Sequence, residues 1–172
     1  MAEPINDLKT IISSKGGLAR PNFFSVVFTF PDGIAYDSRE MTILCESAQM
    51  PGININTNEF QSTRQAVKMP YGFIKEDVNF TFLITNDFGI KKSFDSWVQS
   101  VIDTENYRLK YRDDYAKEVT INQLDKNEKV LHSVTLQKAF PININTIELS
   151  NATENSIQRV TVAMTYENFK EE

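Results

Sequence analysis

The chain has 172 residues, of which 41% are apolar, and a formal net charge of -5 at pH 7. This length predicts one domain, or one domain with arms, and twelve Phe against six Gly exclude a disordered chain. The mild acidity argues against tight sequence-independent binding to nucleic acid, which needs clustered Lys and Arg.

We expect residues 1–20 to form an N-terminal helix or arm, because Ile5, Leu8, Ile11 and Ile12 share one helical face. A helix this short is only marginally stable alone. It therefore packs either on its own domain or on a neighbouring chain. No basic segment leads into an apolar stretch here, so we expect no signal peptide, and no run is long enough to predict a membrane span.

Two strands follow, at residues 23–30 and 41–48, where apolar and polar side chains alternate. We assign Phe24, Val26 and Phe28 to the core face of the first strand. Turn signals rich in proline and glycine follow both strands.

Residues 53–71 favour two strands but are unusually polar, so we predict a projecting β-hairpin. An isolated two-stranded ribbon is marginal in water, so a projecting hairpin gains its stability from a partner. The residues expected at contacts between subunits or rings are Asn58, Glu59, Phe60, Gln61, Arg64 and Lys68.

The clearest signal lies at residues 77–102, where an alternating strand passes through a turn into a three- and four-residue apolar spacing. This change of period predicts a strand followed by an amphipathic helix at residues 91–103. The expected core residues of this segment are Phe80, Phe82, Ile84, Phe94 and Trp97.

Residues 103–118 are highly charged, and we interpret them as an exposed connection with Arg112 and Asp113 at an intersubunit contact. Strands are predicted at 119–124 and 129–140, the latter ended by proline. The last strand covers residues 157–169. Core positions in the two long strands are Val134, Leu136, Val160 and Val162.

These elements predict a mainly β (α+β) fold: one domain over residues 1–172, an antiparallel β-sandwich or barrel of six or more strands with one flanking α-helix and a projecting hairpin. Unpaired sheet edges recruit other strands unless they are blocked. The long strands carry few edge-blocking prolines, so we expect their edges to pair with strands of other copies.

The sequence lacks an evident catalytic or metal constellation. His132 is the only histidine and Cys45 the only cysteine, and each lies in a strand-like alternation that favours a packing role. Asp113 and Asp114 form an acidic pair in a charged loop. Aromatic and basic residues mix at 107–112, but acidic neighbours cancel the charge, so nucleic-acid binding there is the weaker reading. We expect no enzyme activity, cofactor or metal.

The order of several short motifs resembles the tail tube protein family of contractile-tailed phages of the T-even type. The motifs include an Ala-Arg-Pro-Asn-Phe opening at 19–23, the Asn86-Asp87 turn, the Phe94-Asp-Ser-Trp97 helix and Phe-Pro-Ile-Asn-Ile at 140–144. The resemblance extends from about residue 18 to 169 and is weakest at residues 53–73 and 107–118.

The resemblance implies hexameric rings that stack into a tube inside a contractile sheath, with sheets joined edge to edge into an inner barrel that the genome passes through. The implied partners are other copies of the chain, the tail sheath protein, tube-initiating baseplate proteins and DNA in transit without sequence-specific binding. The implied location is the virion, with assembly in the host cytoplasm.

Three alternatives stay open. The chain could be a tube-initiating baseplate protein or the tube protein of a secretion or injection system. It could also be a monomeric β-sandwich module that binds a ligand in an aromatic-lined cleft. A hydrolase would use His132 with Asp113 or Asp114 and would lose activity in His132→Ala.

Overall fold

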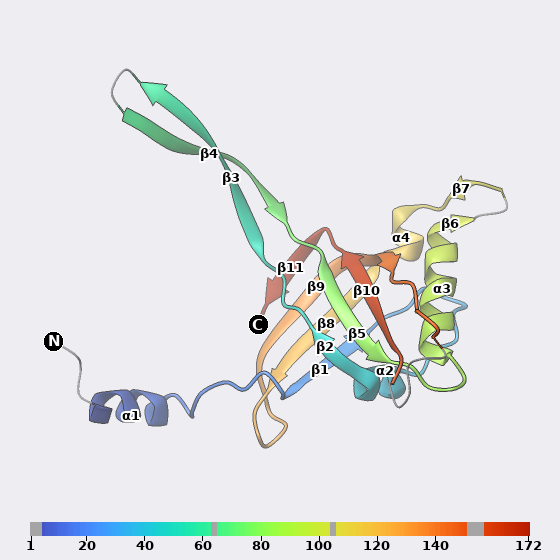
Figure 1. Cartoon of the computed structure of the whole chain (residues 1–172), viewed down its shortest axis with the longest axis horizontal. Helices are drawn as coiled ribbons and strands as arrows, with labels where there is room; N and C mark the ends of the chain where they lie inside the picture. The colour runs from blue at the N-terminus through green and yellow to red at the C-terminus, as the bar shows by residue number, and fades with distance from the viewer. Residues whose placement is uncertain (1–4, 63–64, 104–105, 151–156) are drawn as a thin grey trace.

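The computed structural model describes residues 5–62, 65–103, 106–150 and 157–172 (Figure 1). Within these ranges the chain is mainly β, and its strands pair in antiparallel fashion, which confirms the predicted fold class. The main sheet has seven strands in the order β1-β8-β9-β10-β5-β2, with β11 also paired to β9. Its strands are β1 (Phe24–Phe28), β2 (Cys45–Ala48), β5 (Val78–Leu83), β8 (Lys117–Leu124), β9 (Val130–Ile144), β10 (Arg159–Thr165) and β11 (Asn168–Glu171).

The long strand β9 belongs to two layers of this sheet. Its residues 130–139 pair with β8, and its residues 140–144 pair with β10. Near the end of the first part Lys138 takes a positive φ of 52°, a conformation that bends and twists a strand. We call β1, β8, β11 and the first part of β9 layer A, and β10, β5, β2 and the second part of β9 layer B.

The core fills the space between the two layers. Phe28 of layer A packs edge-on against Phe80 of layer B, with ring centroids 5.1 Å apart, and also contacts Phe94 of the flanking helix. Of the twelve expected core residues, Phe24 and Ile84 are half-buried against the core. The other ten are buried: Val26, Phe28, Phe80, Phe82, Phe94, Trp97, Val134, Leu136, Val160 and Val162.

Helix α3 (Gly89–Val101) covers the core at one side of the strands (Figure 1). It begins two residues before the predicted 91–103 and ends two residues earlier. Trp97 is fully buried, and its indole Nε1 donates a hydrogen bond of 2.8 Å to the carbonyl oxygen of Tyr115. Tyr115 ends the short helix α4 (Arg112–Tyr115), so this bond ties α3 to the segment expected as an exposed connection.

The prediction of a strand over residues 41–48 is wrong in its first half. Residues Ser38–Leu44 form helix α2, and only Cys45–Ala48 form strand β2. The carboxylate of Asp37 caps this helix by accepting from the backbone N–H groups of Arg39 and Glu40, at 2.9 and 3.3 Å. The helix buries Met41 but leaves Ile43 exposed.

Other elements also differ from the predictions. Strand β9 does not end at Pro141. The proline lies where the β9–β10 register shifts, and at that position the strand pairing does not require a backbone N–H. The predicted last strand is divided into β10 and β11. The charged segment after α3 is not only a loop, because it contains α4 and the short paired strands β6 (Ile102–Asp103) and β7 (Arg108–Leu109).

Helix α1 (Ile5–Ser14) stands apart from the strands in Figure 1. Its apolar residues Ile5, Leu8 and Ile11 are 54–69% exposed. The backbone N–H of Gly17 donates to the carbonyl of Ile12 at 2.8 Å, and Gly16, with a positive φ of 80°, takes the left-handed conformation that ends the helix. None of the helices in the described ranges combines the length and apolarity that a membrane crossing requires.

Candidate assembly surfaces

A long hairpin leaves the body of the molecule between β2 and β5 (Figure 1). It consists of β3 (Ile53–Ser62) and β4 (Gln65–Lys75), which pair along their whole length. The hairpin is four residues longer than the predicted 53–71, because β4 continues to Lys75. Strands β2 and β5 pair at its base, so layer B and the hairpin form one continuous ribbon.

The base of the hairpin is held by polar contacts to the body. The ammonium group of Lys75 donates to the carbonyl oxygen of Glu167 at 2.5 Å and to the side-chain oxygen of Asn168 at 3.1 Å. The side-chain amide of Asn54 donates to Glu76 at 2.6 Å. These contacts fix the direction in which the hairpin projects.

Apart from Ile74, which pairs with Asn54 near the base and shares the face of Phe60, the exposed apolar side chains of the hairpin change face along its length. Near the base, Ile53 and Ile55 share a face with Phe73, which is paired with Ile55. Beyond the register shift at Asn56/Thr57, the apolar residues lie on the opposite face. They are Phe60, its partner Val67, and Met69. All six are 46–66% exposed, so the hairpin presents two separate apolar patches to solvent.

The predicted contact residues on the hairpin fall in its outer half. Arg64 lies outside the described residues. Phe60 belongs to the outer apolar patch, and Glu59 and Lys68 face each other across the strands on the other side of the ribbon. The remaining residues predicted there are exposed as well, namely Asn58 and Gln61.

The other two predicted contact residues lie far from the hairpin tip, beside layer A. Arg112 lies 3.7 Å from Glu167, and Asp113 lies 3.5 Å from Lys138, which in turn lies 3.7 Å from Glu167. These four charges form one network within the chain, and each is about half exposed or more. Exposed ion pairs of this kind contribute at most about 1 kcal/mol. The structure therefore does not bring all eight predicted contact residues together.

His132 lies far from the acidic pair that a hydrolase would use. Asp113 contacts Lys138, six positions along β9 from His132, which corresponds to roughly 20 Å of extended strand. No group of three or more His, Cys, Asp or Glu in the described part of the chain is arranged to hold a metal ion. A cleft of about 500 Å³ beside α2 and α3 has Tyr36 as its one aromatic lining residue, unlike the aromatic-lined cleft expected of a ligand-binding module.

Layer B has two open edges. One is β2, which pairs only with β5 in the described sheet. The amide of Gln49 donates to Asn79 of β5 at 3.1 Å, so the amide of Ala48 points the other way, to the open edge. The second open edge is the last part of β9, residues 140–144, because β8 pairs only with residues 130–139.

The β1 edge of layer A is covered instead. Helix α2 packs along β1, and the hydroxyl of Thr42 donates to the outward carbonyl of Val26 at 2.8 Å. A covered edge cannot accept a further strand at that position. The layer that remains open at both ends is therefore layer B.

Sequence reasoning missed these edges, although it anticipated edge pairing in general. The relevant signal was local: Asp37 and Ser38 predict a helix start before Met41, which shortens the following strand to four residues. Nothing in the alternation of β9 shows that its two parts pair with different strands.

Cys45 is buried in the core face of β2. Burial raises the pKa of its thiol to about 12, against a weaker lowering by a hydrogen bond with the backbone of Ser47. We expect the thiol of the folded protein to react with a thiol reagent at about pH 8 roughly a thousandfold more slowly than an ordinary cysteine, because so little thiolate forms. A reagent assay with and without denaturant measures this; rapid labelling of folded protein would contradict it.

We compared the chain with protein families and with known proteins. The family model described as "Phage tail tube protein" matches residues 19–172. The chain is 24% identical over 165 residues to the tail tube protein of Serratia phage KSP90, covering 94% of this chain and 93% of that protein.

Two solved structures share the fold. One is a chain of the anti-feeding prophage baseplate, with a TM-score of 0.66, 14% identity, and coverage of 90% of this chain and 95% of that chain. The other is a chain of the sheath-tube complex of the PVC extracellular contractile injection system in its extended state. Its TM-score is 0.61, with 15% identity and 99% coverage of both chains.

Proposed function

The chain belongs to the phage tail tube protein family, and from that membership we propose that six copies close into a ring and that the rings stack into the inner tube of a tail. Members of this family are structural components of the virion and not enzymes. In this proposal the tube lies inside a contractile sheath and is the conduit through which the genome leaves the particle.

The observation that carries the proposal is the pair of open edges of layer B. This layer contributes four strands, and its open edges are β2 on one side and residues 140–144 of β9 on the other. Pairing the β2 edge of one copy with the β9 edge of the next satisfies the free backbone groups of both. Repeated around a closed ring, this contact leaves no free edge in the layer.

The hairpin supports the stacking of rings. Its two exposed apolar patches lie on opposite faces of a ribbon that leaves the body, so they have nothing in their own subunit to cover them. We assign the base patch, around Ile55 and Phe73, to contact within a ring. We assign the outer patch, around Phe60 and Val67, to the neighbouring ring, together with the predicted contact residues Asn58, Glu59, Gln61, Arg64 and Lys68.

The proposed partners are other copies of the chain, the tail sheath protein and tube-initiating baseplate proteins. DNA passes through without sequence-specific binding. The fold shared with a chain of a contractile injection system sheath-tube complex favours one second candidate, a tube of such a system. The cargo associated with purified particles would separate the two: genomic DNA for a phage tail, protein for an injection device.

The substitution Ala48→Pro tests the edge contact. Proline removes the amide that points to the open edge of β2 and leaves the Gln49 bond to β5 in place. We expect a folded subunit that forms neither rings nor tubes, as seen by negative-stain electron microscopy and analytical ultracentrifugation.

Ala48→Gly is the matched control, because it also changes the side chain at this position but keeps the amide. It is expected to assemble like the parent. Normal rings from Ala48→Pro, with a melting temperature close to the parental value, would show that this edge does not join subunits.

A further inference from the structure

The face of layer B that points away from the core is uncharged over its central part. Along β5 and β10 every second residue is buried in the core, so the residues between them point outward. Thr81 and Thr161 are directly opposite each other there, with their hydroxyl oxygens 3.2 Å apart. The uncharged outward residues of the layer include Ser47, Asn79, Thr81, Leu83, Phe140, Asn143, Thr161, Ala163 and Thr165.

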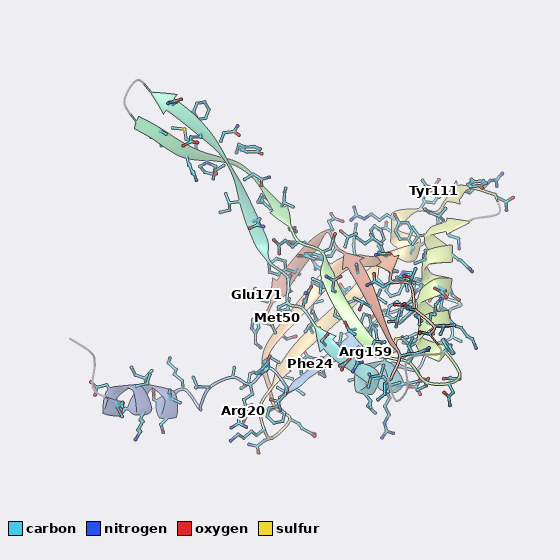
Figure 2. All side chains as sticks on the ribbon, viewed as in Figure 1. Arg20, Phe24, Met50, Tyr111, Arg159 and Glu171 are labelled. Atoms are coloured by element: carbon cyan, nitrogen blue, oxygen red, sulfur yellow. The ribbon has the colours of Figure 1, made fainter. Side chains whose placement is uncertain are left out.

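Within the four strands of this layer, the charged outward residues are Glu46 and Arg159, at the end away from the hairpin. The guanidinium of Arg159 donates to the Glu46 carboxylate through two nitrogens, Nε and Nη2, the latter at 3.0 Å. The two residues come from β2 and β10 and reach each other across β5. Figure 2 labels Arg159. The hydrogen bonds from Arg159 lower the pKa of Glu46, so the carboxylate stays ionised at neutral pH and the pair has no net charge.

If layer B closes into the ring, this face lines the hole. Layer A and helix α3 lie on the opposite side of layer B, and their bulk fits only on the larger outer circumference of a ring. A passing DNA duplex would then meet hydroxyls, amides and methyl groups from each copy. Such a wall binds DNA only weakly. The free energy gained when counterions leave the phosphates grows with the number of unpaired cations that replace them, and this wall has few.

We propose that Glu46 acts as a charge-neutralising residue of the tube wall, which holds Arg159 away from the phosphates of DNA in transit. This inference rests on the proposed function, since it needs copies arranged around a hole. Removing the carboxylate would leave one Arg159 per subunit without its partner. Each ring of the stack would then carry six unpaired positive charges around its hole. Removing the guanidinium instead would expose six negative charges, which repel DNA.

The experiment compares tubes of the full-length parent, Glu46→Gln, Arg159→Gln and the double variant. Each is mixed with a short fluorescent DNA duplex at low and moderate salt, and the tubes are sedimented. We expect Glu46→Gln tubes to retain roughly tenfold more DNA than the parent at low salt, with the excess lost as salt rises. Arg159→Gln and the double variant are expected to retain no more than the parent.

A second measurement locates the face. Thr161→Cys places a thiol on the outward face of layer B, and Thr135→Cys places one on the outward face of layer A, where Thr135 also meets a cross-strand threonine, Thr120, at 3.2 Å. In tubes, a small maleimide should label both, but a maleimide carried by a large polymer should label only Thr135→Cys. The native Cys45 is buried and gives little background.

The outcomes are distinguishable. If the parent forms no tubes, the proposed function fails. If all four proteins form tubes and Glu46→Gln retains no extra DNA, the tube stands and the role of Glu46 is wrong. If Arg159→Gln retains as much DNA as Glu46→Gln, the charge at this pair does not determine how much DNA the tube wall retains, and the inference is wrong. Equal polymer labelling of both thiols would place this face on the outside of the tube and overturn the inference.

Discussion

A subunit that lacks the outer half of the hairpin is expected to fold and to form rings but not tubes. Thr57 and Pro70 are paired across the two strands, so residues 58–69 can be replaced by an Asn-Gly turn that joins them directly. The change removes the outer apolar patch but keeps the base patch and the contacts of Lys75. Electron microscopy should therefore show single rings or very short stacks where the parent gives long tubes.

Two single substitutions sharpen this test because they lie side by side on β3 but point to opposite faces. Phe60→Ala removes an exposed aromatic ring of the outer patch, whereas Glu59→Ala removes a carboxylate that faces Lys68. We expect only Phe60→Ala to shorten tubes strongly. Long tubes from the hairpin-shortened protein would contradict an inter-ring role for this segment.

Replacing Trp97 by alanine is expected to cause the largest loss of stability. The ring is fully buried, packs at a tilt against Phe30 with ring centroids 4.6 Å apart, and donates to the carbonyl of Tyr115. Loss of a buried tryptophan costs about 3–5 kcal/mol in the free energy of unfolding. For a chain of this size the melting temperature should fall by roughly 10–15 °C.

Trp97→Phe separates the two contributions. It keeps an aromatic ring in the core but leaves the carbonyl of Tyr115 without its indole donor, so we expect a loss of about 1–3 kcal/mol. Both variants are measured by denaturant unfolding of the unassembled subunit. A parental melting curve for Trp97→Ala would mean that α3 does not pack as described.

The core of this fold was predictable because its strands obey a simple alternation. In β5 and β10 every second residue is buried, and the change of period after Leu83 marks the start of α3. The resemblance drawn from short motifs also proved correct, since the family match covers residues 19–172. Alternation works here because each layer is covered by the core on one face only.

The errors occurred where local chemistry competes with that alternation. Asp37 caps a helix over residues that also alternate like a strand, and alternation alone favours the wrong choice. At Pro141 the missing amide predicts a strand end. Here, however, the proline lies at a register shift, where the ladder does not need it.

The projection of the hairpin was predictable, but the faces that its side chains occupy were not. An excess of polar residues correctly indicated that the hairpin projects. On β4 the register shift at Asn56/Thr57 puts Phe73 and Val67 on opposite faces although they are an even number of residues apart, and the alternation of the sequence does not reveal it. The edges of layer B depend on which strands pair, a property of the whole chain. The Glu46–Arg159 pair joins residues 113 positions apart, so spacing could not indicate it.

The hairpin leaves the body on one side only, and this gives any stack of subunits a direction (Figure 1). In such a stack, one end exposes the hairpins, and the other end exposes the surfaces that the hairpins contact. Monomers therefore add to the two termini through different encounters and at different rates. A filament seeded at one terminus grows away from its seed, so the platform that nucleates it also sets its orientation.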